Sequence, residues 1–326
     1  MGATLSGTLP SIRSHNVDAV YRQMKQPIDG LVGLKFFPIK EIRKEDVVYD
    51  VYQAATGLMK PTGENAPAPK IQFTKLDEVT LRPVTFKESY EIVGQDIVFV
   101  KQDKDYAREY LANALKNLKI RELSRIEWSI WQALTGTLSI DENGVTRTVT
   151  YSGIQTFSAS NSWATSSTDI VGDLVTIMKL YRGTGARPRY MICNQTVAGY
   201  LLKNDTFEAY YSNSGLAPID GVKRFLTSLG LELIVYDGGY INSSGTFVPY
   251  IGEDKVFFIG EGPYPPGHFF STLTIEGPTM TPRPGEFARI KEDTDGDPKK
   301  IQVIAGIRGL PGIVFPSWIV YADVVP

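Results

Sequence analysis

Few residues of this 326-residue chain have the type and spacing that catalysis requires. His15 and His268 are the only histidines, and Cys193 is the only cysteine. His15 lies in a polar N-terminal stretch and His268 follows a proline cluster, so no Ser-His-Asp or Cys-His pair is expected. A single cysteine excludes an intrachain disulfide and a thiolate metal cluster. The sequence therefore predicts no catalytic residue, no metal ligand and no cofactor, and a protein that is not an enzyme.

One acidic stretch has part of the spacing of a calcium-binding loop. Asp293, Asp295 and Asp297 match the first ligands of such a loop. Gly296 stands at the fourth position, although the loop needs its glycine at the sixth, and Ile304 stands where the bidentate glutamate belongs. We interpret the stretch as a solvated acidic turn.

Charge and hydropathy limit the partners that the chain can bind. Its formal charge of -2 gives no long-range attraction to nucleic acid, so DNA could be contacted only loosely and non-specifically. No apolar run approaches the roughly 20 residues that span a bilayer. The first ten residues lack the basic start and apolar middle of a signal peptide. We therefore expect no membrane association and a protein that stays in the cytoplasm in which it is made.

A long helix is the element around which the other parts must be arranged. Asp103 to Gly136 contains no internal glycine or proline, and Asp105 adds a carboxylate at the end where the helix dipole favours one. Apolar residues recur at helical spacing, with a one-residue slip between Leu118 and Leu123. Such a helix would be about 50 Å long, so we expect it to act as a spine.

The segment from Val47 to Ile92 predicts a two-stranded finger. Apolar and polar residues alternate on both sides of a glycine- and proline-rich break at 54–69. Leu58 and Met59 are apolar residues at the tip of that break. A two-stranded ribbon is marginally stable by itself, so we expect a second copy of the protein to cover it.

The rest of the chain predicts an α/β lobe and strands that return to the spine. Asn143-Gly144 is a strong hairpin signal. Helices and strands then alternate over 168–181, 190–193, 195–203 and 231–236. This order is typical of an α/β lobe within an α+β protein. Lys300–Arg308 and Ile313–Ala322 are expected to be strands that pair beside the spine helix.

Five aromatic residues have two interpretations. Tyr210, Tyr211, Trp163, Trp318 and Tyr321 would be core residues on ordinary expectation. In a subunit of an assembly, however, such residues are also the usual interface anchors. Neither interpretation requires a ligand.

The order of these parts resembles the tailed-phage major capsid proteins of the Hong Kong 97 type, and specifically the lambda-like capsid protein E family. The likeness extends over nearly the whole chain from about Leu31. It is carried by segments 36–38, 47–50, 57–61, 188–194, 235–240, 252–260 and 309–316. Each segment is weak by itself, but their order and separations together make a strong signal.

The resemblance implies a fold with an N-terminal arm, an extended two-stranded E-loop, a P-domain with the spine helix and β-strands, and an α/β A-domain. The implied boundaries are an arm at 1–46, an E-loop β-hairpin at 47–92, a P-domain at 93–164 (spine helix and β-hairpin insertion) and 271–326 (return strands), and an A-domain at 165–270. The residues that it places between subunits are Leu58, Met59, Lys60 and Pro61 at the E-loop tip, and Tyr210, Tyr211, Asp237, Tyr240 and Asn242 in A-domain loops at the capsomer axis.

The function that the resemblance implies is a phage head. Hexamers and pentamers of one chain would form an icosahedral shell, assembled in the host cytoplasm, around packaged double-stranded DNA. Lys60 suggests an intersubunit isopeptide bond, but 271–326 contains no asparagine, so we expect no such bond. Because the arm is short, we expect a separate scaffold protein, together with a portal and possibly a decoration protein. An encapsulin-like compartment that encloses enzymes is the alternative with the same architecture.

Overall fold

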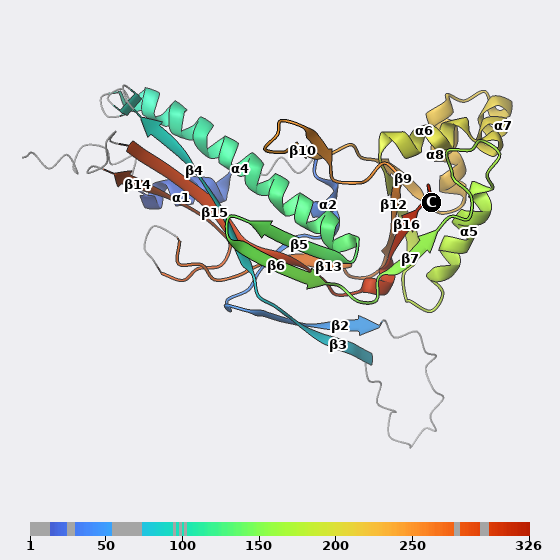
Figure 1. Cartoon of the computed structure of the whole chain (residues 1–326), viewed down its shortest axis with the longest axis horizontal. Coiled ribbons are helices and arrows are strands. Elements are labelled where there is room, and N and C mark those ends of the chain that lie inside the picture. The colour runs from blue at the N-terminus through green and yellow to red at the C-terminus, as the bar shows by residue number, and fades with distance from the viewer. Residues whose placement is uncertain are drawn as a thin grey trace, which may run out of the picture.

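One long helix, α4 (Lys104–Leu134), crosses the computed structural model diagonally (Figure 1). The structure describes residues 14–24, 30–53, 74–93, 96–97, 100, 103–276, 281–293 and 300–326. The Asp103 side chain accepts hydrogen bonds from the amides of Asp105 and Tyr106, which caps the helix N-terminus. Gly136 follows the helix with a φ of 96°, a conformation that glycine adopts without strain. The predicted spine helix is therefore confirmed.

The N-terminal half of α4 packs on a sheet whose central strand is β15 (Lys300–Ile313). β14 (Glu286–Asp293) pairs with one edge of β15 and β4 (Val84–Val93) with the other. Further along, β15 pairs with β13 (Gly267–Ser271), which pairs in parallel with β1 (Ile39–Glu41). Alternate residues of β15 are buried toward α4 and α1 (Ser14–Gln23). As expected from its sequence, β15 thus lies beside the spine helix.

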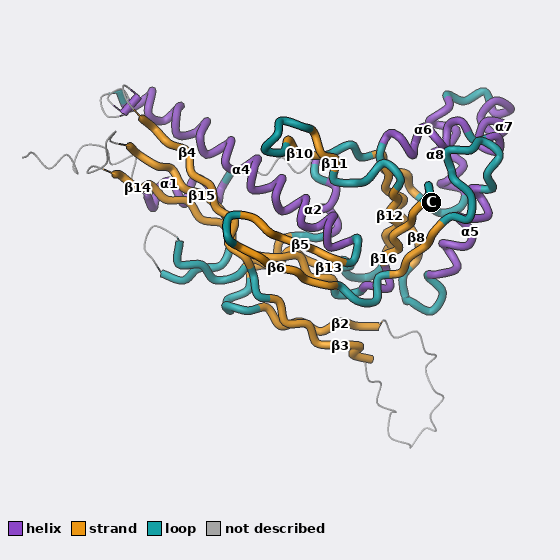
Figure 2. The backbone as a smooth tube through the Cα atoms, viewed as in Figure 1, coloured by secondary structure: helices purple, strands orange, loops and turns teal. Residues whose placement is uncertain are grey.

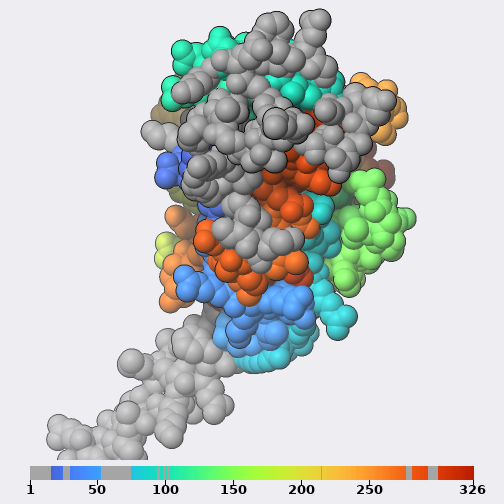
Figure 3. Space-filling model, turned by 90° about the vertical axis from the view of Figure 1, so that its left-hand side faces the viewer, coloured from blue at the N-terminus to red at the C-terminus, as the bar shows by residue number. Residues whose placement is uncertain are grey.

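The two-stranded ribbon is shorter than the predicted finger of 47–92. It consists of β2 (Val47–Gln53) paired with β3 (Thr74–Leu81). Pro83 separates β3 from β4, and β4 belongs to the sheet beneath α4, where Ile92 is fully buried. The prediction was wrong for β4, because the same alternation of residues suits a ribbon and a sheet strand equally well. Figure 3 shows β2 and β3 side by side at the lower edge of the body.

A second sheet forms the other end of the molecule (Figure 2). Its strands, in spatial order, are β7 (Gln155–Ser158), β16 (Ile319–Asp323), β12 (Lys255–Glu261), β8 (Arg187–Cys193) and β9 (Glu232–Val235). Four helices accompany it, namely α5 (Ile170–Leu180), α6 (Gln195–Lys203), α7 (Asp205–Ser214) and α8 (Pro218–Ser228). The expected α/β alternation of this region is therefore confirmed. The predicted position of Ile313–Ala322 was wrong, because β16 pairs with β12 and β7 here instead of beside β15.

The two faces of this second sheet belong to two different hydrophobic cores. Met191, Cys193 and Phe258 point into the core formed with helices α5–α8. Ile192 and Phe257, one residue out of phase, point into the core that contains the C-terminal half of α4. Because successive side chains point to opposite faces, the second sheet packs on helices α5–α8 with one face and on α4 with the other.

Short elements complete the part of the chain that the structure describes. They are α2 (Val32–Phe36), the 3-10 turn η3 (Pro316–Trp318), and the hairpins β5 (Thr137–Glu142) with β6 (Val145–Thr150) and β10 (Gly239–Ile241) with β11 (Phe247–Pro249). The turn between β5 and β6 has positive φ angles at Asn143 and Gly144, so the predicted hairpin is confirmed.

Candidate functional site

The environments of Cys193 and His268 do not favour catalysis. Burial raises the pKa of the Cys193 thiol to about 12, which is the opposite of what a reactive cysteine needs. Burial also lowers the pKa of His268, whose ring lies 5.7 Å from that of Phe270. The side chain of His15 and residues 294–299 of the acidic turn lie outside the described residues. The candidate functional sites are therefore surfaces that could contact other molecules.

Residues of β2 fix the described part of the ribbon to the body. The amide of Ile313 donates to the hydroxyl oxygen of Tyr49 at 3.3 Å, and the Tyr49 ring lies 5.3 Å from that of Phe270. The amide of Tyr52 donates to the carbonyl oxygen of Val314 at 3.1 Å. These contacts tie β2 to the end of β15, so the ribbon has a defined direction as it leaves the body (Figure 1).

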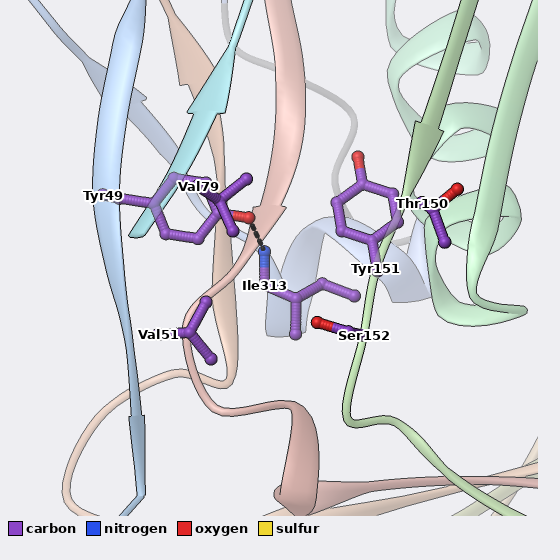
Figure 4. A pocket seen from close by; sticks show the side chains of 7 residues that line it. All are labelled: Tyr49, Val51, Val79, Thr150, Tyr151, Ser152 and Ile313. Carbon is purple, nitrogen blue, oxygen red and sulfur yellow. Dashed lines mark hydrogen bonds between the residues drawn. The ribbon is translucent and has the colours of Figure 1, made fainter. Parts of the chain in front are cut away.

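A small cavity lies where the ribbon meets the body. Figure 4 shows Tyr49, Val51 and Val79 of the ribbon on one side and Tyr151 on the other, with Ile313 between them. The cavity has a volume of about 10 Å³, the lower limit for a single water molecule. The Tyr151 hydroxyl donates to the carbonyl oxygen of Pro311 at 2.7 Å. The base of the ribbon is therefore closely packed and offers no room for a ligand.

The ribbon also exposes apolar side chains. Val48 is 51% exposed and Leu76 is 52% exposed. Residues 75–78 of β3 are all exposed, as is unusual for consecutive residues of a strand with one buried face. The predicted tip residues Leu58, Met59, Lys60 and Pro61 lie outside the described residues.

The predicted capsomer-axis residues occupy two separate places. Tyr210 and Tyr211 lie in α7, where the Tyr210 ring contacts Phe225 at 5.2 Å and the Tyr211 hydroxyl donates to the carbonyl oxygen of Leu202. Both side chains are half-buried. Figure 1 shows α7 at the helical end of the molecule and β10 near the middle, beside α4, so the two groups lie on different parts of the structure.

The second group, Asp237, Tyr240 and Asn242, lies in and beside the β10–β11 hairpin. The Asp237 carboxylate accepts a hydrogen bond from the backbone amide of Gln195 and so helps to cap the N-terminus of α6. The Tyr240 ring stacks on Tyr250 at 6.1 Å, and the Tyr250 hydroxyl donates to the carbonyl oxygen of Ser124 on α4. The side-chain oxygen of Asn242 accepts hydrogen bonds from the backbone amides of Ser244 and Thr246 in the same turn. The hairpin is thus fastened to the spine, and it exposes Ile241 and Phe247 at its tip.

The remaining aromatic residues are in the core. Trp163 is fully buried and Trp318 nearly so. Tyr321 is half-buried and lies 5.3 Å from Phe257. The ordinary interpretation of these three residues as core residues is therefore confirmed.

Sequence reasoning missed a buried charged cluster that joins α1, α4 and β14. Lys119 and Glu122 on α4 pair at 3.3 Å, and Lys119 also pairs with Glu286 on β14. The Tyr21 hydroxyl of α1 donates to Glu122 at 3.1 Å, and its ring lies beneath the Lys119 ammonium. Two carboxylates therefore share one buried cation. A signal existed, because Lys119 and Glu122 fall on the helical positions of the apolar stripe.

Glu122 is expected to make stability depend on pH. Burial raises the pKa of Glu122 to about 8, Lys119 opposes that rise, and Glu286 adds to it. Because the folded pKa lies above the ordinary 4.5, the stability from this proton is complete at low pH and is lost as pH rises through about 8. Glu122→Gln should remove this dependence. In urea unfolding of the single chain, the free energy of unfolding of the variant, relative to that of the wild type, should rise by roughly 1 kcal/mol per pH unit between pH 5 and 8.

The exposed Glu109 on the same helix provides the control. Glu109→Gln should follow the wild-type curve at every pH. A constant difference in the free energy of unfolding between Glu122→Gln and the wild type across this pH range would show that protonation of Glu122 does not contribute to stability.

A second buried carboxylate connects α4 to α2. Glu127 is fully buried and accepts hydrogen bonds from the amides of Gly33 at 2.6 Å and Leu34 at 3.1 Å. It also accepts from the indole nitrogen of Trp131 at 2.8 Å. Burial raises the pKa of Glu127, although these bonds oppose the rise. Glu127 therefore satisfies three buried donors and fixes α2 on the spine.

The fold and these surfaces define a class of protein. A spine helix over a sheet, an extended ribbon and a separate α/β lobe together form the Hong Kong 97-type capsid fold, whose α+β architecture the sequence predicted. The model of the family "Phage major capsid protein E" matches residues 14–324. The chain belongs to this family and is a phage major capsid protein. None of the helices in the described ranges has the length and apolarity that crossing a membrane requires.

Solved structures agree with this fold. The capsid protein assigned to a prophage of E. coli CFT073 is 17% identical, with a TM-score of 0.62 over 96% of this chain and 99% of that one. A phage-related protein from Bordetella bronchiseptica RB50 is 12% identical, with a TM-score of 0.61 over 96% and 97%. The capsid of Myoviridae phage XM1 is 12% identical, with a TM-score of 0.52 over 91% and 92%.

Proposed function

We propose that many copies of this chain assemble as hexamers and pentamers into an icosahedral head around double-stranded DNA. The observation that carries the proposal is the ribbon, which is packed against the body through Tyr49 and Val51 and leaves Val48 and Leu76 exposed. Fully burying one such side chain contributes roughly 1.5–3 kcal/mol. A modest contact of this size, repeated around every subunit, would stabilise a closed shell while leaving each single contact reversible.

The proposal assigns a role to each region. The arm (1–46) and E-loop (47–92, including the tip Leu58–Pro61) would contact neighbouring copies, the P-domain (93–164 and 271–326) would form the shell wall, and the A-domain (165–270) would lie toward the capsomer axis. Within the A-domain, Tyr210 and Tyr211 on α7 and the hairpin around Asp237, Tyr240 and Asn242 would then contact neighbours at two different places. The described part of the E-loop ends at β3, since β4 pairs with β15.

The partners would be structural ones. Copies of the chain would build the head in the host cytoplasm with a separate scaffold protein and a portal, and a decoration protein could bind the finished virion. DNA would be contacted without sequence specificity, in keeping with the formal charge of -2. The subunit would act mechanically and would not be an enzyme. Membership of a phage capsid family favours this function over a compartment that encloses enzymes.

Electron microscopy of the chain, expressed with the head genes that flank it, tests this function. We expect closed shells with fivefold and sixfold clusters and, in heads from infected cells, nuclease-protected double-stranded DNA. A subunit that stays monomeric at high concentration would contradict the proposal, and so would shells that enclose an enzyme instead of DNA.

A further inference from the structure

The buried cluster of Lys119, Glu122 and Glu286 holds one amine and two carboxyl groups away from water. Each of the three side chains is at most 11% exposed. The Lys119 nitrogen pairs with both carboxyl groups, one on its own helix and one on β14. An amine and a carboxyl group that stay in contact can condense to an amide, and the only other product is water. The cluster therefore contains the reactants of an amide bond within one chain.

Tyr21 of α1 closes the cluster on its remaining side. Its ring centroid lies 4.8 Å from the Lys119 nitrogen, and its hydroxyl donates to Glu122 at 3.1 Å. Tyr21 is itself fully buried, in the same hydrophobic cluster as Leu118 and Ala288. Three elements of the fold thus hold the amine against the carboxyl groups. Groups held in this way react as if at very high concentration, with effective molarities on the order of 10⁵ M or more in well-oriented cases.

The charges of the cluster favour uncharged reactants. Burial raises the pKa of Glu122 to about 8, so this carboxyl group holds a proton at neutral pH. Burying the ammonium of Lys119 beside the carboxylate of Glu286 is costly, because both ions lose their hydration. Transfer of one proton from the ammonium to that carboxylate removes both charges. The cluster then contains a free amine, a carboxylic acid and a second acid that can move protons.

We propose that Lys119 and Glu286 join through an amide bond within one chain, with Glu122 carrying the protons. The Nζ atom of Lys119 attacks the carboxyl carbon of Glu286, and a new N–C bond forms. Glu122 donates its proton to the departing hydroxyl group, which leaves as water when the C–O bond breaks. Glu122 then takes a proton from the amide nitrogen and is restored. The sum of the steps is one amine and one acid giving one amide and one water.

The structure favours Glu286 over Glu122 as the carboxyl group that is joined. Glu122 contacts Lys119 through one oxygen and Tyr21 through the other, which suits a group that passes protons. A bond from Lys119 to Glu122 would also have to close across a single turn of α4. A bond to Glu286 joins two neighbouring elements without changing either. It would fasten the spine helix covalently to β14.

An exposed cluster on the ribbon has the same groups and provides a comparison within the chain. Lys75 pairs with Asp50 at 2.7 Å and with Glu78 at 2.6 Å. Each of these side chains is at least 34% exposed, so the ions keep much of their hydration and remain charged. Contact alone is therefore present at both places, and burial is present only at Lys119. We expect Lys75 to stay unlinked.

Mass spectrometry of the purified wild-type chain tests the proposal. The intact mass should be lower than the sequence mass by one water molecule in most chains. Digestion should give one branched peptide in which Lys119 is joined to Glu286, and trypsin should not cleave after Lys119. The peptide that contains Lys75 should have its ordinary mass. Lys119→Arg keeps a positive charge but has no amine, so this variant should have its full sequence mass.

The role of Glu122 is tested by the rate of the reaction. After a short pulse of cell-free synthesis, the fraction of chains that has lost water is followed with time. Glu122→Gln keeps the size of the side chain but has no acidic proton, so it should link roughly a hundredfold more slowly or less completely still. Glu109→Gln, at an exposed position of the same helix, should link at the wild-type rate. Circular dichroism should show that each variant is folded.

The wild-type mass decides the central claim even if a variant does not fold. The proposal is overturned if the wild-type chain has its full sequence mass, if Lys119 is joined to Glu122, or if the bond joins two chains. It is also overturned if folded Glu122→Gln links as fast as the wild type. The measurement uses single chains, so its outcome does not depend on whether the chain forms shells.

Discussion

Replacing Val48 and Leu76 together with aspartate is expected to abolish shell formation and leave the subunit folded. Both side chains are about half exposed in the single chain, so charges at these positions remain hydrated in the monomer. In a shell, the same carboxylates would be buried against a neighbouring copy without partners, which costs several kcal/mol at each repeated contact. Sedimentation velocity should show monomers or small oligomers, while circular dichroism and the melting temperature stay close to wild type.

The contrast with exposed valines elsewhere makes this test specific. Val145 on β6 and Val175 on α5 are 39% and 37% exposed, away from the ribbon. Val145→Asp/Val175→Asp should still give shells. If the ribbon variant forms shells in wild-type yield, the ribbon does not make the contact that we assign to it.

Glu127→Ala is expected to destabilise the subunit by about 4 kcal/mol, because a buried carboxylate that serves three donors is removed. The amides of Gly33 and Leu34 and the Trp131 indole would remain buried without an acceptor. Glu127→Gln keeps one acceptor oxygen and should lose less. The measurement is the free energy of unfolding in urea.

The matched control for this substitution is Glu109→Ala, an exposed glutamate on the same helix. It should change stability by less than about 0.5 kcal/mol. A loss below 1 kcal/mol for Glu127→Ala would mean that α2 is held on the spine by apolar contacts instead.

Local features of the sequence predicted the spine helix and the β5–β6 hairpin well. Asp103 and Gly136 mark the two ends of the helix, and Asn143-Gly144 marks the turn, because each of these signals acts within a few residues. The slip in the apolar pattern also has a physical reason. Lys119, Glu122 and Glu127 occupy positions of the buried stripe, and their charges are compensated by α1, α2 and β14.

Long-range pairing could not be predicted in the same way. The alternation in β4 and β16 identifies each as a strand with one buried face, but it does not say which strand lies alongside. β4 therefore pairs with β15 instead of extending the ribbon, and β16 joins the second sheet.

The candidate surfaces were predictable only in part. An exposed ribbon followed from its sequence, because two strands cannot bury their own faces. The buried ion pair between Lys119 and Glu286 did not, since the two residues come from distant segments that only the folded chain brings together. The role of Tyr210 and Tyr240 at the capsomer axis was suggested by resemblance alone, and the structure places these residues in α7 and in the β10–β11 hairpin.

Hydrogen exchange of the β2 and β3 amides, compared between the soluble subunit and assembled shells, tests most directly whether neighbours complete the ribbon. We expect weak protection of these amides in the subunit and at least a hundredfold slower exchange in shells, with α4 amides unchanged. Equal and strong protection of the ribbon in both states would show that the single chain already covers it, and would contradict the proposed role of the ribbon in assembly.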